Sequence, residues 1–214
     1  NDLSPAANAW RTFFLRNKPV AYATDASRGT TPVWQSLANL DQAKSNYGAI
    51  VYNKAPGILK QLNYLVGDTA FRDGLRSYLH GHAYGNATWP DLLRAIGRTS
   101  GMDLVPWGKE YILRPGMPVI SQSVEPGADG WTLTLVQAPA RPLSGPAQWP
   151  IKTELLVVGT DGESRTTPLL LTAARTTRHF AGTPPAFVFP NAGDEAYALV
   201  QLDSASVRWA EAHL

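Results

Sequence analysis

The stretch that says most about this chain is Ala49-Ile50-Val51-Tyr52-Asn53-Lys54-Ala55-Pro56-Gly57-Ile58-Leu59. Apolar side chains recur through residues 46–66 at mixed three- and four-residue spacings, which is typical of a packed helix. They are Ile50, Ile58, Leu59, Leu62 and Leu65. Pro56 has no backbone N–H to continue the helical hydrogen bonds, so we expect a kink or a break near Lys54.

Further helices are predicted on both sides of this stretch. Ser4-Pro5 and Thr31-Pro32 precede two of them, and Thr88 with Asp91 three residues later is typical of a capped helix start. The predicted helices cover residues 3–17, 33–40, 46–66, 69–82, 88–98 and 104–113. The first half of the chain is therefore predicted to be all helical.

The pattern changes near Arg114-Pro115-Gly116-Met117-Pro118, after which apolar residues recur at every second position. Short strands, separated by Gly, Pro and Asp, are predicted at residues 131–136, 151–158, 164–171, 176–181, 186–189 and 196–202. Such a series indicates a β-sandwich. We therefore predict an α+β chain, with an all-α helical domain at residues 1–117, a small β-sandwich at 118–203, and the start of a further helical segment at 204–214.

Composition excludes several classes of function. Of the 214 residues, 44% are hydrophobic and 17% are charged, which is enough apolar material for real cores. The net charge of +2 is too small to predict a nucleic-acid partner, and no apolar run approaches the roughly 18 residues of a membrane span. The chain has no cysteine, which excludes disulfides but leaves both a periplasmic or secreted and a cytoplasmic location open.

The sequence offers no zinc-binding motif. Its histidines are His80, His82, His179 and His213, and no two of them have the four-residue spacing of a His-Glu-x-x-His helix. Four scattered histidines without a cysteine do not build a tetrahedral site. We therefore predict that this chain alone binds no metal and no other cofactor.

Two motifs and the helical run between them nevertheless occur in a characteristic order. The stretch around Tyr52 is followed by the helical run Thr69–Leu79 and then by His82-Ala83-Tyr84-Gly85-Asn86-Ala87-Thr88-Trp89-Pro90-Asp91-Leu92-Leu93. This order resembles the aminopeptidase N family of zinc metallopeptidases, of the gluzincin type, downstream of its metal site. The second half resembles the β-sandwich of that family at Gln148-Trp149-Pro150-Ile151 and at residues 190–197.

The resemblance gives Tyr52 a role that its position alone does not. A tyrosine on an apolar helix is ordinarily core filler with its hydroxyl satisfied. In the family, a Tyr followed by x-Lys-Gly lies across the cleft from zinc and donates a hydrogen bond to the oxyanion of the tetrahedral intermediate. Here the motif reads Tyr52-Asn53-Lys54-Ala55, so Ala55 replaces the usual glycine. The resemblance implies that Tyr52 is catalytic, whereas we interpret Lys54 as a solvated or scaffold-pairing cation.

The resemblance also implies that the chain is a fragment. It would begin just after the zinc-binding motif of a thermolysin-like catalytic domain, with the zinc ligands and the general-base Glu upstream of Asn1. The full-length parent would use zinc to remove N-terminal residues from peptides, and this chain alone would be inactive. Its expected partners are peptide substrates and the missing N-terminal part of the same protein.

Two other interpretations remain open at this point. The chain could be a structural or interaction module, a helical lobe with a β-sandwich that never had a metal site. It could also come from a relative of the enzyme that has lost its metal. The residues encoded immediately before Asn1 distinguish the first of these from the peptidase, and metal analysis of the full-length parent addresses the second.

Overall fold

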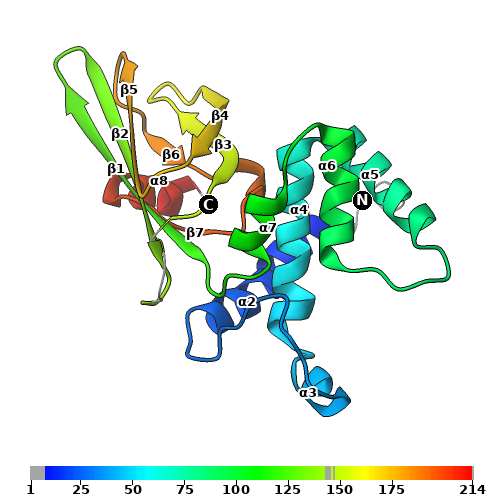
Figure 1. The fold of residues 1–214 in the computed structure, drawn as a ribbon. Coiled ribbons are helices and arrows are strands. Elements are labelled where there is room, and N and C mark those ends of the chain that lie inside the picture. Colours follow the sequence, from blue (N-terminus) through cyan, green and yellow to red (C-terminus); the bar gives the residue numbers. More distant parts are fainter. Residues whose placement is uncertain (1–7, 143–145, 147, 214) are drawn as a thin grey trace. The chain divides into compact units, whose positions relative to one another are not determined.

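The computed structural model of this chain describes residues 8–142, 146 and 148–213. The chain folds into two compact units, Asn1–Pro115 and Gly116–Leu214. The first unit is helical and the second is built on two β-sheets (Figure 1). The predicted α+β class, a helical lobe followed by a β-sandwich, is confirmed.

The helical unit consists of short α-helices, two of which continue directly from a π-helical turn. Its elements are α1 (Ala9–Thr12), η2 (Phe13–Asn17), α2 (Lys18–Asp25), α3 (Leu40–Ser45), η3 (Ile50–Lys54), α4 (Ala55–Val66), α5 (Asp68–Gly81), α6 (Trp89–Ser100) and α7 (Val105–Tyr111). In Figure 1, α4, α5 and α6 lie close to one another, and the small helix α3 projects away from them.

The helix predicted through residues 46–66 changes its hydrogen-bonding pattern instead of breaking at Pro56. Its first turn, η3, is π-helical, and the Ala55 N–H donates to the Ile50 carbonyl five residues earlier. Pro56 then falls in the first turn of α4, where a missing N–H is tolerated. The same arrangement occurs earlier in the chain, where η2 precedes Pro19 in the first turn of α2. A π-helical turn therefore replaces the predicted kink or break.

Helices α5 and α6 pack closely because a glycine lies where they cross. A Cβ atom on Gly74 would come within 2.6 Å of the Ile96 Cα atom. The predicted cap at the start of α6 is confirmed, since the Thr88 N–H donates to the Asp91 carboxylate at 2.9 Å and the Thr88 hydroxyl donates at 2.6 Å. These hydrogen bonds, together with one from Arg94, lower the pKa of Asp91 to about 2.

The helix predicted at residues 33–40 is wrong. That segment is irregular, and α3 begins only at Leu40. The Asn39 side chain accepts from the Gln42 N–H at 2.9 Å, and the Gln42 side chain accepts from the Ala38 N–H at 2.8 Å. These contacts satisfy backbone donors that a helix start leaves without partners, so the helix begins where they are available.

The first predicted helix, at residues 3–17, is longer than expected at its end. Its Ser4-Pro5 start lies outside the described residues. From Ala9 the chain stays helical through α1, η2 and α2 to Asp25, past the predicted end at Asn17. The helix continues past Asn17 because Pro19 falls in the first turn of α2, directly after the π-helical turn, where its missing N–H is tolerated.

The second unit is a β-sandwich with one C-terminal helix. Its strands are β1 (Pro118–Gly127), β2 (Gly130–Pro139), β3 (Ile151–Val158), β4 (Ser164–Leu171), β5 (Arg175–Ala181), β6 (Phe187–Phe189) and β7 (Leu199–Gln201). A four-stranded sheet has the order β5-β2-β1-β7, and a three-stranded sheet has the order β4-β3-β6. Strands β1 and β7 are parallel, and the other pairs are antiparallel.

Strand β1 was not among the predicted strands, because polar residues occupy much of it. Gln122 lies in its centre and is buried, and the Gln122 amide donates to the Val188 carbonyl at 3.0 Å and to the Asp203 carboxylate at 2.6 Å. Asp203 also accepts from the Ser206 N–H at 3.0 Å at the start of helix α8 (Ser204–His213). The buried glutamine thus joins two strands and the last helix.

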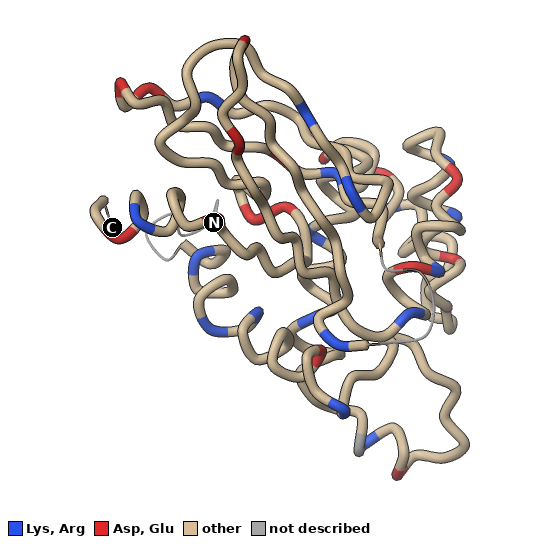
Figure 2. Tube along the Cα trace, turned by 90° about the vertical axis from the view of Figure 1, so that its left-hand side faces the viewer, with Lys and Arg blue, Asp and Glu red and all other residues tan. Residues whose placement is uncertain are grey.

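Charged residues are spread over both units. Figure 2 shows Lys and Arg interspersed with Asp and Glu along the trace of each unit, with long uncharged runs in the strands. Within the described part of the chain, no helix combines the length and the apolar character needed to cross a membrane.

Candidate active site

Tyr52 lies on the outer side of the η3 turn. Its side chain is 59% exposed, and its ring meets the Tyr47 ring edge to face, with centroids 6.0 Å apart. Its backbone N–H donates to the Gly48 carbonyl at 3.0 Å. The Tyr52 hydroxyl forms no hydrogen bond with any other residue that the structure describes. Tyr52 is therefore not the core filler that a tyrosine on an apolar helix would ordinarily be, and its hydroxyl is available to a ligand.

Lys54 points to the opposite side of the same turn and is buried. Its ammonium lies 2.9 Å from the Asp25 carboxylate at the end of α2, with the two side chains 2% and 0% exposed. Asp25 also accepts from the Thr30 hydroxyl at 2.8 Å. Burial lowers the pKa of Lys54, while the Asp25 carboxylate opposes that shift. Of the two interpretations of Lys54, the structure supports a cation paired within the scaffold.

A second contact joins η3 to the N-terminal helix. The Asn17 amide, at the end of η2, donates to the Asn53 side-chain oxygen at 3.3 Å. Asn53 lies between Tyr52 and Lys54. The two residues that follow Tyr52 therefore both hold the η3 turn against the N-terminal helices. Sequence reasoning did not find Asn17 or Asp25, because nothing in their local sequence points to a partner far along the chain.

Behind this turn, α4 and α7 are linked through polar groups. Gln61 of α4 forms a hydrogen bond with the Tyr111 hydroxyl of α7, and both side chains are buried. Burial raises the pKa of Tyr111 far above its ordinary value, so this tyrosine stays neutral. Close by, Arg114 donates to Glu110 at 2.8 Å. This layer supports α4 from the side of α7.

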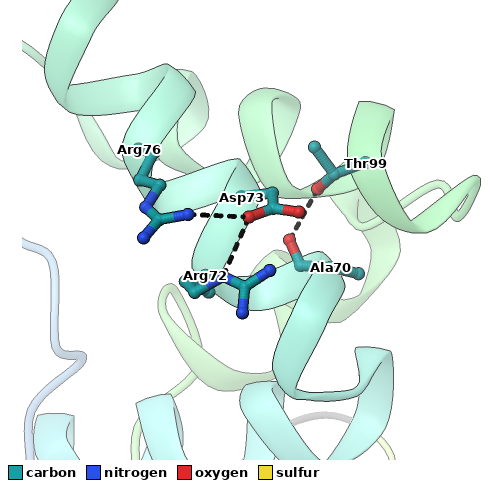
Figure 3. Close-up of polar contacts among 5 residues, drawn as sticks. All are labelled: Ala70, Arg72, Asp73, Arg76 and Thr99. Atoms are coloured by element: carbon teal, nitrogen blue, oxygen red, sulfur yellow. Dashed lines mark hydrogen bonds and ion pairs between the residues drawn. The ribbon is translucent and has the colours of Figure 1, made fainter.

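A charged cluster on α5 is conspicuous but does not resemble a catalytic group. Figure 3 shows the Asp73 carboxylate between the guanidinium groups of Arg72 and Arg76, with nitrogen–oxygen distances of 2.9 and 3.4 Å. Arg72, the nearer cation, contributes most to lowering the pKa of Asp73, which therefore stays ionised. In the same view the Thr99 hydroxyl donates to the Ala70 carbonyl at 2.7 Å and ties α6 to α5.

The histidines are too scattered to form a metal site. His80 and His82 lie at the end of α5, where the His82 ring packs on Tyr78 at 5.4 Å. His179 is in β5 and His213 is at the end of α8. Among the described residues, no three His, Cys, Asp or Glu side chains gather where they could hold a metal ion. The residues described here therefore do not fit a zinc site.

The sequence of this chain is similar to those of several known proteins. Residues 1–110 match the peptidase family M1 domain. The chain is 31% identical to aminopeptidase N of Streptomyces lividans over 97% of its own length and 26% of that relative. It is 30% identical to leucyl aminopeptidase of Saccharolobus solfataricus, over 58% of this chain and 16% of the relative. It is also 31% identical to tricorn protease-interacting factor F2 of Thermoplasma acidophilum, over 66% and 18%.

These matches define the class of protein to which the chain belongs. The chain belongs to peptidase family M1, a family of metallopeptidases of the hydrolase class that includes the aminopeptidases N. The predicted membership in the aminopeptidase N family is thereby confirmed. The chain spans about a quarter of the length of its Streptomyces lividans relative, 26%, and smaller shares of the others. Tyr52 lies inside the part that matches the family.

Proposed function

We propose that this chain is part of a zinc-dependent aminopeptidase that removes N-terminal residues from peptides, and that Tyr52 stabilises its transition state. Three observations support this. Tyr52 lies within the residues that match peptidase family M1. Its side chain is exposed, and its hydroxyl has no hydrogen-bond partner within the described part of the chain. Its motif, Tyr52-Asn53-Lys54, also resembles the one that carries this role in the aminopeptidase N family.

The chemistry needs a donor of this kind. When a peptide carbonyl becomes tetrahedral, negative charge collects on its oxygen. A phenol held by a fixed backbone can donate a hydrogen bond to that oxygen, and the bond is stronger in the transition state than in the ground state. By analogy with other oxyanion donors, the contribution is about 3 kcal/mol. Tyr52 would donate this bond without giving up its proton.

The zinc ion and its ligands would come from a part of the protein outside these 214 residues. The described residues bring together no set of ligands for it. When bound, zinc would supply the Lewis acid and the activated water that peptide hydrolysis needs. The chain alone would then contribute Tyr52 and its supporting helices, and it would not cleave peptides.

The elements that precede Tyr52 in the chain expose many large apolar side chains. Large side chains on α1, η2, α2, α3 and the segments that join them are exposed, namely Trp10, Phe14, Leu15, Val20, Trp34, Leu37, Leu40 and Tyr47. Where such side chains gather into an extended patch, they mark a surface that contacts another part of a protein. We propose that the metal-binding part of the same catalytic domain covers these side chains and faces Tyr52.

Replacing Tyr52→Phe in the full-length enzyme tests the proposal. The change removes one hydroxyl and little volume, so the fold and the zinc content should be retained. We expect kcat for an aminoacyl anilide to fall by about a hundredfold or more, while KM changes much less. Tyr84→Phe is the matched control, because the Tyr84 side chain is exposed as well but lies in the loop between α5 and α6. Its kcat should stay at the wild-type value.

Two results would contradict the proposal. A Tyr52→Phe enzyme with a kcat within about threefold of wild type would remove this hydroxyl from the mechanism, because loss of an oxyanion donor costs far more. A full-length protein without zinc and without peptidase activity would favour the non-catalytic helical and β-sandwich module instead.

A further inference from the structure

Asp25 and Lys54 form a buried ion pair whose presence is not explained by packing alone. Both side chains are almost completely shielded from water, and the ammonium and carboxylate lie 2.9 Å apart. Taking two charges out of water costs much of what their attraction returns, so an apolar pair of similar volume often stabilises a fold equally well. Stability is therefore a weak reason for this pair to exist.

The position of the pair suggests another reason. Lys54 is the last residue of the π-helical turn that begins at Ile50, and Tyr52 lies two residues before it on the opposite, exposed side. Among the described residues, the Tyr52 ring meets the Tyr47 ring edge to face, Tyr47 is itself exposed, and the Tyr52 hydroxyl makes no hydrogen bond. With 59% of its surface exposed, the Tyr52 side chain depends on the backbone of the turn for much of its direction.

Side chains on its inner side hold the backbone of this π-helical turn in place. Asp25 binds Lys54 from the end of α2, and Asn17 donates to Asn53 from the end of η2. Asp25 is itself fixed by the Thr30 hydroxyl at 2.8 Å. A charged pair has a defined distance and direction, whereas apolar side chains can slide past one another, so the pair fixes the turn more sharply than apolar packing would.

We propose that Asp25 and Lys54 are positioning residues, whose buried ion pair fixes the π-helical turn so that the Tyr52 hydroxyl is held where the oxyanion forms. The inference rests on the proposed function of Tyr52. It assigns the pair no contact with substrate and no proton transfer. Its effect reaches the reaction through the backbone of residues 52–54.

The test uses a double variant, Asp25→Asn with Lys54→Met, in the full-length enzyme. A single change would leave one buried charge without its partner and risks unfolding, whereas the double variant removes both charges and keeps the volumes close. Asn at position 25 can still accept from Thr30. We expect a thermal midpoint close to wild type, a kcat lower by about tenfold or more, and a KM changed much less.

The matched control is Asp73→Asn with Arg76→Met. This pair joins an Asp and a cation at 3.4 Å on α5, but its side chains are exposed to water, and α5 is not among the elements proposed to contact the metal-binding part. Its kcat should equal the wild-type value. If the buried double variant keeps wild-type kcat as well, the pair is structural and the inference is overturned.

A second measurement asks whether the pair acts through the Tyr52 hydroxyl. In a Tyr52→Phe background the double variant should cause little further loss of kcat, because the group that it positions is already gone. Losses that multiply independently would overturn the inference. If Tyr52→Phe alone leaves kcat unchanged, the proposed function fails. Whether the ion pair fixes the direction of the Tyr52 side chain must then be measured without using activity.

Whether the pair positions Tyr52 is then measured by fluorine NMR of the full-length enzyme with 3-fluorotyrosine at position 52. The Tyr47 ring lies edge to face with this ring, so the fluorine shift reports the direction of the Tyr52 side chain. Wild type should give one narrow resonance, and the Asp25→Asn, Lys54→Met variant a shifted or broadened one at the same temperature. Identical spectra would overturn the claim that the pair positions Tyr52.

Discussion

The two units of this chain cover their apolar side chains to very different degrees. Among the described residues, the large apolar side chains exposed in the β-sandwich unit are Val136, Leu170, Leu199 and Val207. The helical unit exposes many more, including aromatic rings on α1, η2 and η3 and leucines on η2, α3 and α4. The β-sandwich thus completes its own core, whereas the helical unit exposes apolar surface on the elements that carry or adjoin Tyr52.

The two units also differ in the kinds of side chain that they bury. The β-sandwich is closed by aromatic stacking, with Trp131 on Phe180 at 4.2 Å and Phe187 on Trp209 of α8 at 4.7 Å. The helical unit also packs aromatic rings, with Trp107 on Tyr111 at 5.1 Å, but it buries charge as well, with Lys54 paired to Asp25. Exposed apolar rings on the helical unit are what we expect if, as proposed, another part of the protein covers them. A β-sandwich with a complete core has the composition of a self-sufficient module.

The largest expected effect concerns the exposed apolar surface. The 214-residue chain should self-associate through its helical unit, and Leu15→Lys with Leu40→Lys should weaken that association by about tenfold or more, since burial of each leucine contributes about 1.5 kcal/mol or more. Sedimentation velocity measures the change. Leu170→Lys is the control, because Leu170 is 55% exposed and Leu15 is 57% exposed. An equal loss with Leu170→Lys would remove the distinction between the units.

A second prediction concerns packing inside the helical unit. Gly74→Ala should destabilise the chain by about 1–3 kcal/mol, because the new methyl group would press on the backbone of α6 at Ile96. Gly81→Ala on the same helix has nothing within 4 Å of the added Cβ and should be neutral or slightly stabilising. Urea unfolding of both variants measures the difference. Equal midpoints would show that α5 and α6 do not cross as closely as the structure describes.

The smallest expected effect is a pH dependence of stability that comes from the cap of α6. Hydrogen bonds from Thr88 and Arg94 lower the pKa of Asp91 from 3.8 to about 2. The folded state therefore favours the ionised carboxylate, and this stabilisation is present above 3.8 and lost as the pH falls toward 2. Wild type should exceed Asp91→Asn in thermal midpoint near neutral pH, and the gap should narrow in that acid range. A gap that is constant with pH would contradict the capping role.

Sequence alone predicted those parts of the fold that depend on neighbouring residues. The cap formed by Thr88 and Asp91 was readable because both partners lie three residues apart. The helix around Tyr52 was readable from the spacing of its apolar residues. The helix predicted at 33–40 is wrong because Thr31-Pro32 does not start a helix, whereas Asn39, which accepts from the Gln42 N–H, caps the helix that begins at Leu40.

What could not be predicted depends on contacts across the fold. Strand β1 was missed because Gln122 does not look like a core residue until Val188 and Asp203 are placed beside it. The partner of Lys54 lies at Asp25 on another helix, and no local pattern joins the two. Neither periodicity nor spacing shows that the turn at residues 50–54 is π-helical.

The central claim is that Tyr52 binds the transition state better than the substrate. The most direct test measures how tightly the full-length enzyme binds a phosphinic pseudopeptide, whose tetrahedral oxyanion imitates that state. Tyr52→Phe should weaken this affinity by about the same factor as it lowers kcat/KM, roughly a hundredfold, and should leave the affinity for a product-like amino acid nearly unchanged. An unchanged affinity for the pseudopeptide, or an equal loss for both ligands, would contradict the account.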